Sequence, residues 1–294
     1  MAAMDPRRLM RLATVASLSV ALVLIGAKAV AWWTTDSISM MSSLLDTSLD
    51  LIGSMVTFVA VRQALVPADA DHGFGHGKAE GLAGLVQAGF IAASGVALLI
   101  VVGERLLNPH QVQREEIGVA ISALAVVLTL ALVAFQRHVV RRSGSVAIEA
   151  DMAHYRTDLV ASIVTGLGTF LSGRLDQPSI DSGVAAFVAL YLMHGAWQTG
   201  RGSFDMLMDR ELPASDRRRI QEIALGHAAV KGIHELRTRS AGLTRFIQLH
   251  LDVDRDLSLV RAHEIGDEVE AGIRQCFPDA EIILHVDPAP EPTP

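Results

Sequence analysis

Hydrophobic residues are concentrated in six long runs over roughly the first 205 positions of the chain. The runs lie near 10–33, 38–63, 80–107, 115–140, 145–173 and 178–205. A hydrocarbon core about 30 Å thick requires roughly 20 helical residues to cross it, and each run meets that length. The pattern therefore predicts an all-α domain of six membrane-spanning helices over residues 1–208.

The pattern changes after Pro213 and becomes that of a small soluble domain. It predicts a helix over 214–227, strands over 232–240 and 243–253, a helix over 257–277 and a strand over 281–286. Helix, strand, strand, helix, strand is enough for a small α+β domain in which a sheet packs on helices, and we expect it over 209–287. The proline-rich tail, 288–294, is expected to be disordered.

Composition supports this division into a membrane part and a polar part. The chain of 294 residues is 50% hydrophobic and 19% charged, and its mean hydropathy is +0.36. From Met206 onward there are 11 Lys or Arg, 16 Asp or Glu and five of the 11 His. A single cysteine, Cys276, excludes an internal disulfide and a thiolate-rich metal cage, so any metal ligands must be nitrogen and oxygen atoms.

Charges next to the predicted spans predict the orientation of the chain. The tail 1–11 and the loops 62–78 and 137–145 carry eight Lys or Arg, and the alternate loops carry three. Because positive residues favour the cytoplasmic side, both termini are expected in the cytoplasm. The first apolar run is too long for the core of a signal peptide, so we interpret it as the first span.

Two pairs of ionisable residues lie four positions apart inside predicted spans: Asp46 with Asp50, and His154 with Asp158. Ionisable residues at membrane depth are costly and mark ion or proton pathways. Residues four apart share one face of a helix, so each pair can present two side chains to one ion. Three carboxylates and one imidazole suit Zn²⁺ or another divalent ion. The alternative for Asp46 and Asp50 is a pair of polar residues at a helix end near the membrane surface.

With these pairs, the segments 67–80 and Leu236–Arg239 resemble the cation diffusion facilitator family, in its bacterial branch of zinc and ferrous-iron efflux pumps. The resemblance implies a homodimer in the bacterial cytoplasmic (inner) membrane and a soluble α-β-β-α-β domain of metallochaperone-like fold in the cytoplasm. It further implies exchange of a divalent cation for protons at the four intramembrane residues. The expected partners are a second copy, the lipid bilayer and the exchanged ions, with no nucleic acid.

The loop between the second and third spans has its own candidate ligands. Asp69, His72 and His76 place three metal-ligand side chains within eight residues, among glycines that allow tight turns. The alternative is a solvated polar loop. The resemblance implies that these residues form a second metal site at the cytoplasmic membrane surface.

The C-terminal domain carries further histidines. His285 and Asp287 are two apart on a predicted strand and so point to one face. Spacing alone leaves open whether the remaining histidines join them. The resemblance implies a zinc-binding cluster that stabilises the dimer, made of His234, His250, His263, His285 and Asp287. His227 lies outside the match and is expected at the surface.

Several charged residues flank or enter the spans without belonging to these clusters. The resemblance implies that Lys78 and Asp209 make charge contacts that lock the protomers together; the alternative is ordinary snorkelling and loop charge. Lys28 is expected to snorkel toward the outer interface. Four acids are expected at the membrane interface without a chemical role: Asp71, Glu80, Glu149 and Asp151.

These observations predict a secondary transporter, not an enzyme, that exports Zn²⁺ in exchange for protons by alternating access. Fe²⁺, Cd²⁺ and Co²⁺ fit the same ligands, because one imidazole shifts preference away from Mn²⁺ and the lack of thiolates disfavours Cu⁺. Metal binding requires deprotonated ligands, so metal and protons compete. The alternative is a membrane-anchored metal sensor without transport. An intramembrane protease is a weaker alternative, since H-E-x-x-H and G-x-S-x-G are absent from the sequence.

Overall fold

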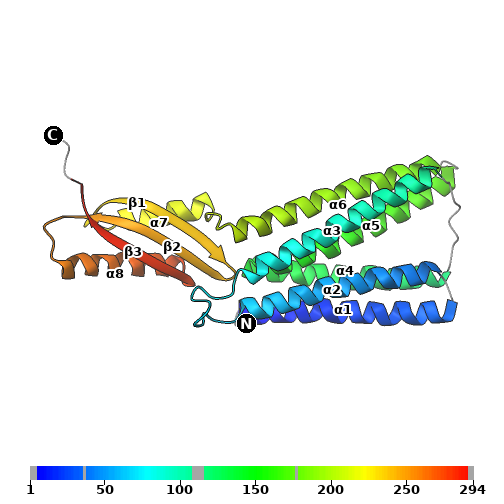
Figure 1. Cartoon of the computed structure of the whole chain (residues 1–294), viewed down its shortest axis with the longest axis horizontal. Helices are drawn as coiled ribbons and strands as arrows, with labels where there is room; N and C mark the ends of the chain where they lie inside the picture. The colour runs from blue at the N-terminus through cyan, green and yellow to red at the C-terminus, as the bar shows by residue number, and fades with distance from the viewer. Residues whose placement is uncertain (1–4, 36–37, 108–115, 176–177, 291–294) are drawn as a thin grey trace. The chain divides into compact units, whose positions relative to one another are not determined.

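The computed structural model describes residues 5–35, 38–107, 116–175 and 178–290 (Figure 1). The chain forms two compact units, Met1–Phe204 and Asp205–Pro294. The first is helical and the second combines helices with a three-stranded sheet. The predicted fold class is therefore confirmed, while the predicted domain limits at 208 and 287 stay predictions.

Six long helices make up the first unit, and their bounds lie within a few residues of the predicted ones. They are α1 (Pro6–Thr35), α2 (Ile38–Ala64), α3 (Ala79–Leu107), α4 (Glu116–Ser143), α5 (Val146–Leu175) and α6 (Pro178–Leu207). Among the described residues, α1 to α4 are long and apolar enough to cross a membrane. Helix α5 carries Glu149, Asp151, Arg156 and Asp158, which lower its apolar character.

Packing in the helical unit brings α1 against α2 and α4, and brings α5 against α3 and α4. Helix α3 approaches α6 closely at Gly84, where an added Cβ would overlap the Ser203 hydroxyl. Large apolar side chains on the outer faces remain exposed, such as Ile100 at 66% and Leu190 at 65%. A helix bundle whose outer faces are apolar is suited to a lipid environment.

The second unit follows the predicted order of elements. It contains α7 (Ala214–Leu225), β1 (Val230–Ala241), β2 (Thr244–Val253), α8 (Leu259–Cys276) and β3 (Ala280–Pro288). The sheet order is β1-β2-β3, with β1 antiparallel and β3 parallel to β2. A two-residue turn joins β1 to β2, and Gly242 there has φ 60°, a conformation that glycine adopts without strain.

The two faces of this sheet have different roles because side chains alternate along each strand. Ile247, Leu249 and Leu251 of β2 are buried against Ile265 and Val269 of α8. The even-numbered residues of β2 point to the opposite face, away from the helices. At the end of β3, the N–H of residue 289 donates to the carbonyl of residue 253 at 2.7 Å. The predicted tail 288–294 thus begins inside the strand, and 291–294 lie outside the described residues.

Candidate metal centres

Helices α2 and α5 bring together three of the four predicted intramembrane ligands. His154 Nε2 lies 3.1 Å from Asp50 Oδ1 and 3.3 Å from Asp158 Oδ2. One ligand atom from each residue falls within 4.8 Å of the others. The His154 side chain is 6% exposed, and those of Asp50 and Asp158 are 26% and 37% exposed. We call Asp50, His154 and Asp158 the intramembrane triad.

Two charged residues lie near the triad but outside it. Asp46 is exposed and lies outside the set of ligand atoms within 4.8 Å of one another, one helical turn before Asp50. Lys28 of α1 donates from its Nζ to the Ser43 carbonyl at 3.2 Å and to the Thr47 hydroxyl, contacts that the sequence did not predict, while its expected extension toward the outer interface stays a prediction. The ammonium group of Lys28 is therefore held by α2, on the helix that supplies Asp50.

The loop between α2 and α3 gathers its three predicted ligands. His72 Nδ1 and His76 Nε2 each lie 3.4 Å from an oxygen of Asp69. The backbone N–H of His72 donates to Asp69 Oδ1 at 2.7 Å, and this hydrogen bond lowers the pKa of the Asp69 carboxyl. Gly75 provides the turn with φ 75°. The nitrogen of His76 that faces Asp69 is Nε2, so this nitrogen is the one positioned to bind a metal with the carboxylate.

Three histidines form a row across the open face of the C-terminal sheet. His234 pairs with His250, and His250 pairs with His285, in the strand register. Each neighbouring pair of rings has centroids 4.8 Å apart. Asp287 lies 2.7 Å from His250, 3.1 Å from His285 and 3.5 Å from His234, so its carboxylate is the centre of the cluster. The hydrogen bond from His250 Nδ1 lowers the pKa of Asp287.

One further acidic residue, Asp252, lies on this face and was not among the predicted ligands. Asp252 pairs with Asp287 in the strand register, and its Oδ1 lies 3.4 Å from His234 Nδ1. Gly232 leaves room for it, since a Cβ there would lie 2.6 Å from Asp252 Oδ2. The sequence contained a signal, because His250-x-Asp252 repeats the spacing of His285-x-Asp287.

Two other histidines of this unit lie apart from the row. His263 is on α8, which packs on the opposite face of the sheet, and its Nε2 lies 3.6 Å from Asp267. The structure therefore does not bring His263 to the cluster within one chain. His227 Nε2 lies 2.8 Å from Glu268, which links the end of α7 to α8.

Lys78 and Asp209 belong to different units, so the contact predicted between protomers stays a prediction. Asp209 has φ 56° and accepts a hydrogen bond from Arg239 at 3.3 Å. The Arg239 guanidinium lies 4.2 Å from the centroid of the Phe246 ring. Asp209 is thus held against β1 within its own unit.

Two acids that were expected at the membrane interface are in fact buried. Glu80 is 1% exposed and accepts hydrogen bonds from the Ser145 hydroxyl and from the backbone N–H of Ala147. Asp151 is 1% exposed and accepts hydrogen bonds from side chains of other helices. Sequence spacing does not reveal this, because the direction in which each acid points depends on how its helix is rotated against its neighbours.

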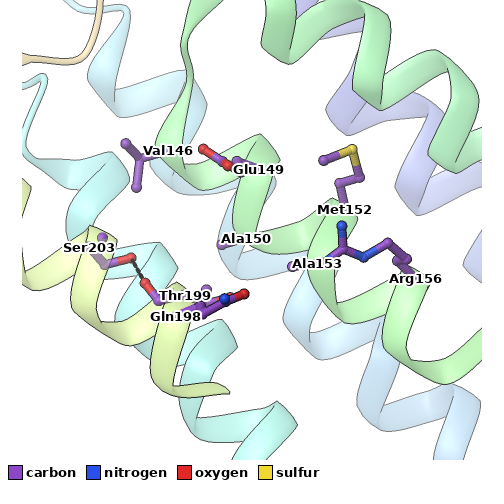
Figure 2. A pocket seen from close by; sticks show the side chains of 10 residues that line it. Val146, Glu149, Ala150, Met152, Ala153, Arg156, Gln198, Thr199 and Ser203 are labelled. Carbon is purple, nitrogen blue, oxygen red and sulfur yellow. Dashed lines mark hydrogen bonds between the residues drawn. The ribbon is translucent and has the colours of Figure 1, made fainter. Parts of the chain in front are cut away.

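A pocket of about 170 Å³ lies between α5 and α6, separate from the triad (Figure 2). Glu149 and Arg156 of α5 and Gln198 of α6 contribute its polar groups. None of the triad residues lines it. Glu149 therefore remains an exposed acid on a different side of α5 from Asp151.

Comparison with known proteins covers both units. The model of the cation efflux transmembrane domain matches residues 14–208, and that of the cytoplasmic domain of cation efflux proteins matches 212–289. The chain is 42% identical over 283 residues to cation-efflux pump FieF of Pectobacterium atrosepticum, covering 96% of this chain and 93% of that one. It is 44% identical over 284 residues to FieF of Shewanella oneidensis, covering 96% of each.

A solved structure of CzrB in its zinc form is also similar, with 32% identity and a TM-score of 0.27. The match covers 29% of this chain and 99% of the chain in that structure. The two family models together span almost the whole sequence, and the FieF relatives align along nearly their full length. The chain is therefore a multi-pass membrane protein of the cation efflux family, the cation diffusion facilitator family that its motifs resemble.

Proposed function

We propose that the protein is a metal/proton antiporter that exports Zn²⁺ from the cytoplasm by alternating access. The observation that carries the proposal is the intramembrane triad, in which Asp50 from α2 meets His154 and Asp158 from α5. These residues offer imidazole nitrogen and carboxylate oxygen, which suit Zn²⁺, Fe²⁺, Co²⁺ and Cd²⁺. Asp46, one turn from Asp50, would complete a four-ligand site in a state that brings α2 closer.

Proton coupling would follow from the chemistry of the ligands. A metal ion binds the deprotonated forms of carboxylate and imidazole, so its arrival releases protons and protonation releases the metal. His154 Nε2 lies 3.1 Å from Asp50 and 3.3 Å from Asp158, so a proton on this nitrogen and a metal ion would compete for the same position between the two carboxylates. Metal and protons would therefore occupy the same site in turn.

The other two clusters would hold resident divalent ions. Asp69, His72 and His76 would bind one in the loop, and the row of His234, His250 and His285 with Asp287 would bind zinc in the C-terminal unit. A bound ion would replace hydrogen bonds within each cluster by ligand bonds and so stiffen it. Neither cluster shares a residue with the triad, which fits structural or regulatory sites.

The proposal includes the cellular arrangement. We place residues 1–208 in the bacterial inner membrane and 209–287 in the cytoplasm with both termini, because eight of the eleven Lys or Arg next to the spans lie on that side. The match to the cytoplasmic domain of cation efflux proteins supports this location for the C-terminal unit. A homodimer, in which Lys78 and Asp209 make charge contacts, belongs to the same proposal.

The test is zinc-driven proton flux in proteoliposomes that contain the full chain. Asp50→Ala and His154→Ala should each abolish the flux, because each removes one triad ligand. His194→Ala is the matched control, since His194 is an exposed histidine of α6 that lies outside the triad and hydrogen-bonds Gln198 at 3.0 Å. Unchanged flux in both variants would refute the assignment of the triad as the transport site.

The same vesicles separate transport from metal sensing. A sensor would bind zinc through its C-terminal cluster without moving it across the membrane. Wild-type protein that binds zinc but shows no zinc accumulation in vesicles would therefore favour the sensor.

A further inference from the structure

One buried carboxylate, that of Asp151 on α5, is bound by side chains from four other helices. Its Oδ2 accepts hydrogen bonds from Ser17 of α1 and Gln136 of α4, both at 2.7 Å. Its Oδ1 accepts from Gln87 of α3 at 3.0 Å and from Ser54 of α2 at 3.3 Å. Each of α1 to α4 thus supplies one donor to a single side chain of α5.

The donors are arranged for a group that only accepts hydrogen bonds. The Gln136 amide also donates to Ser17 at 2.9 Å, and the Gln87 amide also donates to Thr57 at 3.0 Å. The amide oxygens of both glutamines are buried and lack a partner in the described part of the chain. Turning either amide over would place its oxygen against a carboxylate oxygen. A carboxyl group, whose two oxygens can accept the bonds from all four side chains, therefore fits this shell.

The carboxylate lies beside the intramembrane triad on the same two helices. Asp151 precedes His154 by three residues, so both lie on one face of α5. Ser54 follows Asp50 by four residues, so both lie on one face of α2. The Ser54 hydroxyl also bonds the Tyr155 hydroxyl at 2.8 Å. A second polar contact between α2 and α5 thus lies about one helical turn from the triad.

We infer that Asp151 is a positioning residue for the triad. Its carboxylate, held by one donor each from α1 to α4, fixes the rotation and height of α5 so that His154 faces Asp50. A binding site loses affinity when its ligands move by about 1 Å, so supporting contacts of this kind determine how well a metal is held. The inference rests on the proposed function, because it assumes that the triad binds the transported metal.

The experiment measures Co²⁺ binding to the full chain in detergent by visible absorption, which reports ligand geometry directly. The part of the signal that Asp50→Ala removes is assigned to the triad, so the loop and C-terminal sites do not interfere. Asp151→Asn keeps the shape of the side chain but replaces one acceptor by a donor. It should weaken Co²⁺ binding at the triad by about tenfold or more, the usual loss when an outer-shell partner of a metal ligand is removed.

Three further variants make the result specific. Glu149→Gln, two residues away on α5 but exposed, should leave binding within about twofold of the wild type. Asp151→Asn with Gln136→Glu returns a carboxylate to the shell from α4 and should recover most of the lost affinity. Ser54→Ala keeps the carboxylate and removes one donor; it should weaken binding by about threefold, and it serves if Asp151→Asn does not fold.

The outcomes separate the inference from the function beneath it. Unchanged Co²⁺ affinity in Asp151→Asn or, if that variant does not fold, in Ser54→Ala would overturn the positioning role alone. So would failure of the charge-relocating double variant to recover affinity while it melts like the wild type. A wild-type protein with no Asp50-dependent Co²⁺ signal would instead overturn the proposed function, and the positioning role with it.

Discussion

Replacing Gly84 by alanine should separate α3 from α6 and destabilise the helical unit. A Cβ at position 84 would overlap the Ser203 hydroxyl and lie 3.0 Å from Ser203 Cβ and 3.6 Å from Val146 Cγ1. Ser203 is fully buried, and its hydroxyl bonds the carbonyl of Thr199 at 2.9 Å. The hydroxyl can rotate away, but Ser203 Cβ is fixed to its backbone, so the two helices must move apart.

Three contributions determine the change in the free energy of unfolding: two lower it and one raises it. Overpacking of a buried contact costs about 1–3 kcal/mol. Loss of the Ser203 hydrogen bond adds up to about 1 kcal/mol. Alanine favours the helix over glycine by about 1 kcal/mol, which offsets that loss. The free energy of unfolding should therefore fall by about 1–3 kcal/mol, since the overpacking contribution is the one left unopposed.

The assay is unfolding of the purified protein in mild detergent, with Ser203→Ala as the partner variant. Ser203→Ala alone should lower the free energy of unfolding by up to about 1 kcal/mol, the contribution of its hydrogen bond to Thr199. In the Gly84→Ala background it should recover about 1 kcal/mol, since it removes the overlapping oxygen. A Gly84→Ala protein as stable as the wild type, or two changes whose effects simply add, would refute the close contact between α3 and α6.

Two further predictions concern the C-terminal unit. Ile247→Ala should lower the free energy of unfolding of this unit by about 2–5 kcal/mol, because Ile247 is 0% exposed. The control, Ile283→Ala, should lower it much less, because Ile283 is 49% exposed. Equal losses for the two variants in denaturant titrations would contradict the assignment of the two sheet faces. The hydrogen bond from His250 lowers the pKa of Asp287 below its ordinary 3.8, so its stabilisation is present above that value and is lost as pH falls through the lower native pKa. In metal-free Asp287→Asn protein, the melting temperature should therefore fall less steeply between about pH 4 and pH 2 than in the wild type. The same pH dependence in both proteins would count against the hydrogen bond.

Much of the architecture could be predicted from local sequence properties. Span length depends on how many consecutive residues are apolar, so the six helices were placed within a few residues of their bounds. Strand alternation likewise placed His285 and Asp287 on one face, where they lie 3.1 Å apart. The C-terminal order of helix, strand, strand, helix and strand was predicted correctly for the same reason.

Contacts between elements were harder to predict, because periodicity defines a face but not the element that it meets. For Lys28, the sequence did not predict that its ammonium group donates to Thr47 on the neighbouring helix. Glu80 was assigned no role, but it binds the first turn of α5. In both cases the side chain can reach either environment, and only the packing of the neighbouring helix decides between them.

The sequence by itself determined the number of spans, the spacing that puts His154 and Asp158 on one side of α5, and the kinds of ligand atoms available. The tertiary structure alone decided that Asp50 completes the triad and that Asp46 lies outside it in this state. It also placed Asp151 where four helices supply its hydrogen bonds. The physical reason is that these contacts depend on the relative rotation of helices far apart in the chain, which is set by packing across the whole bundle.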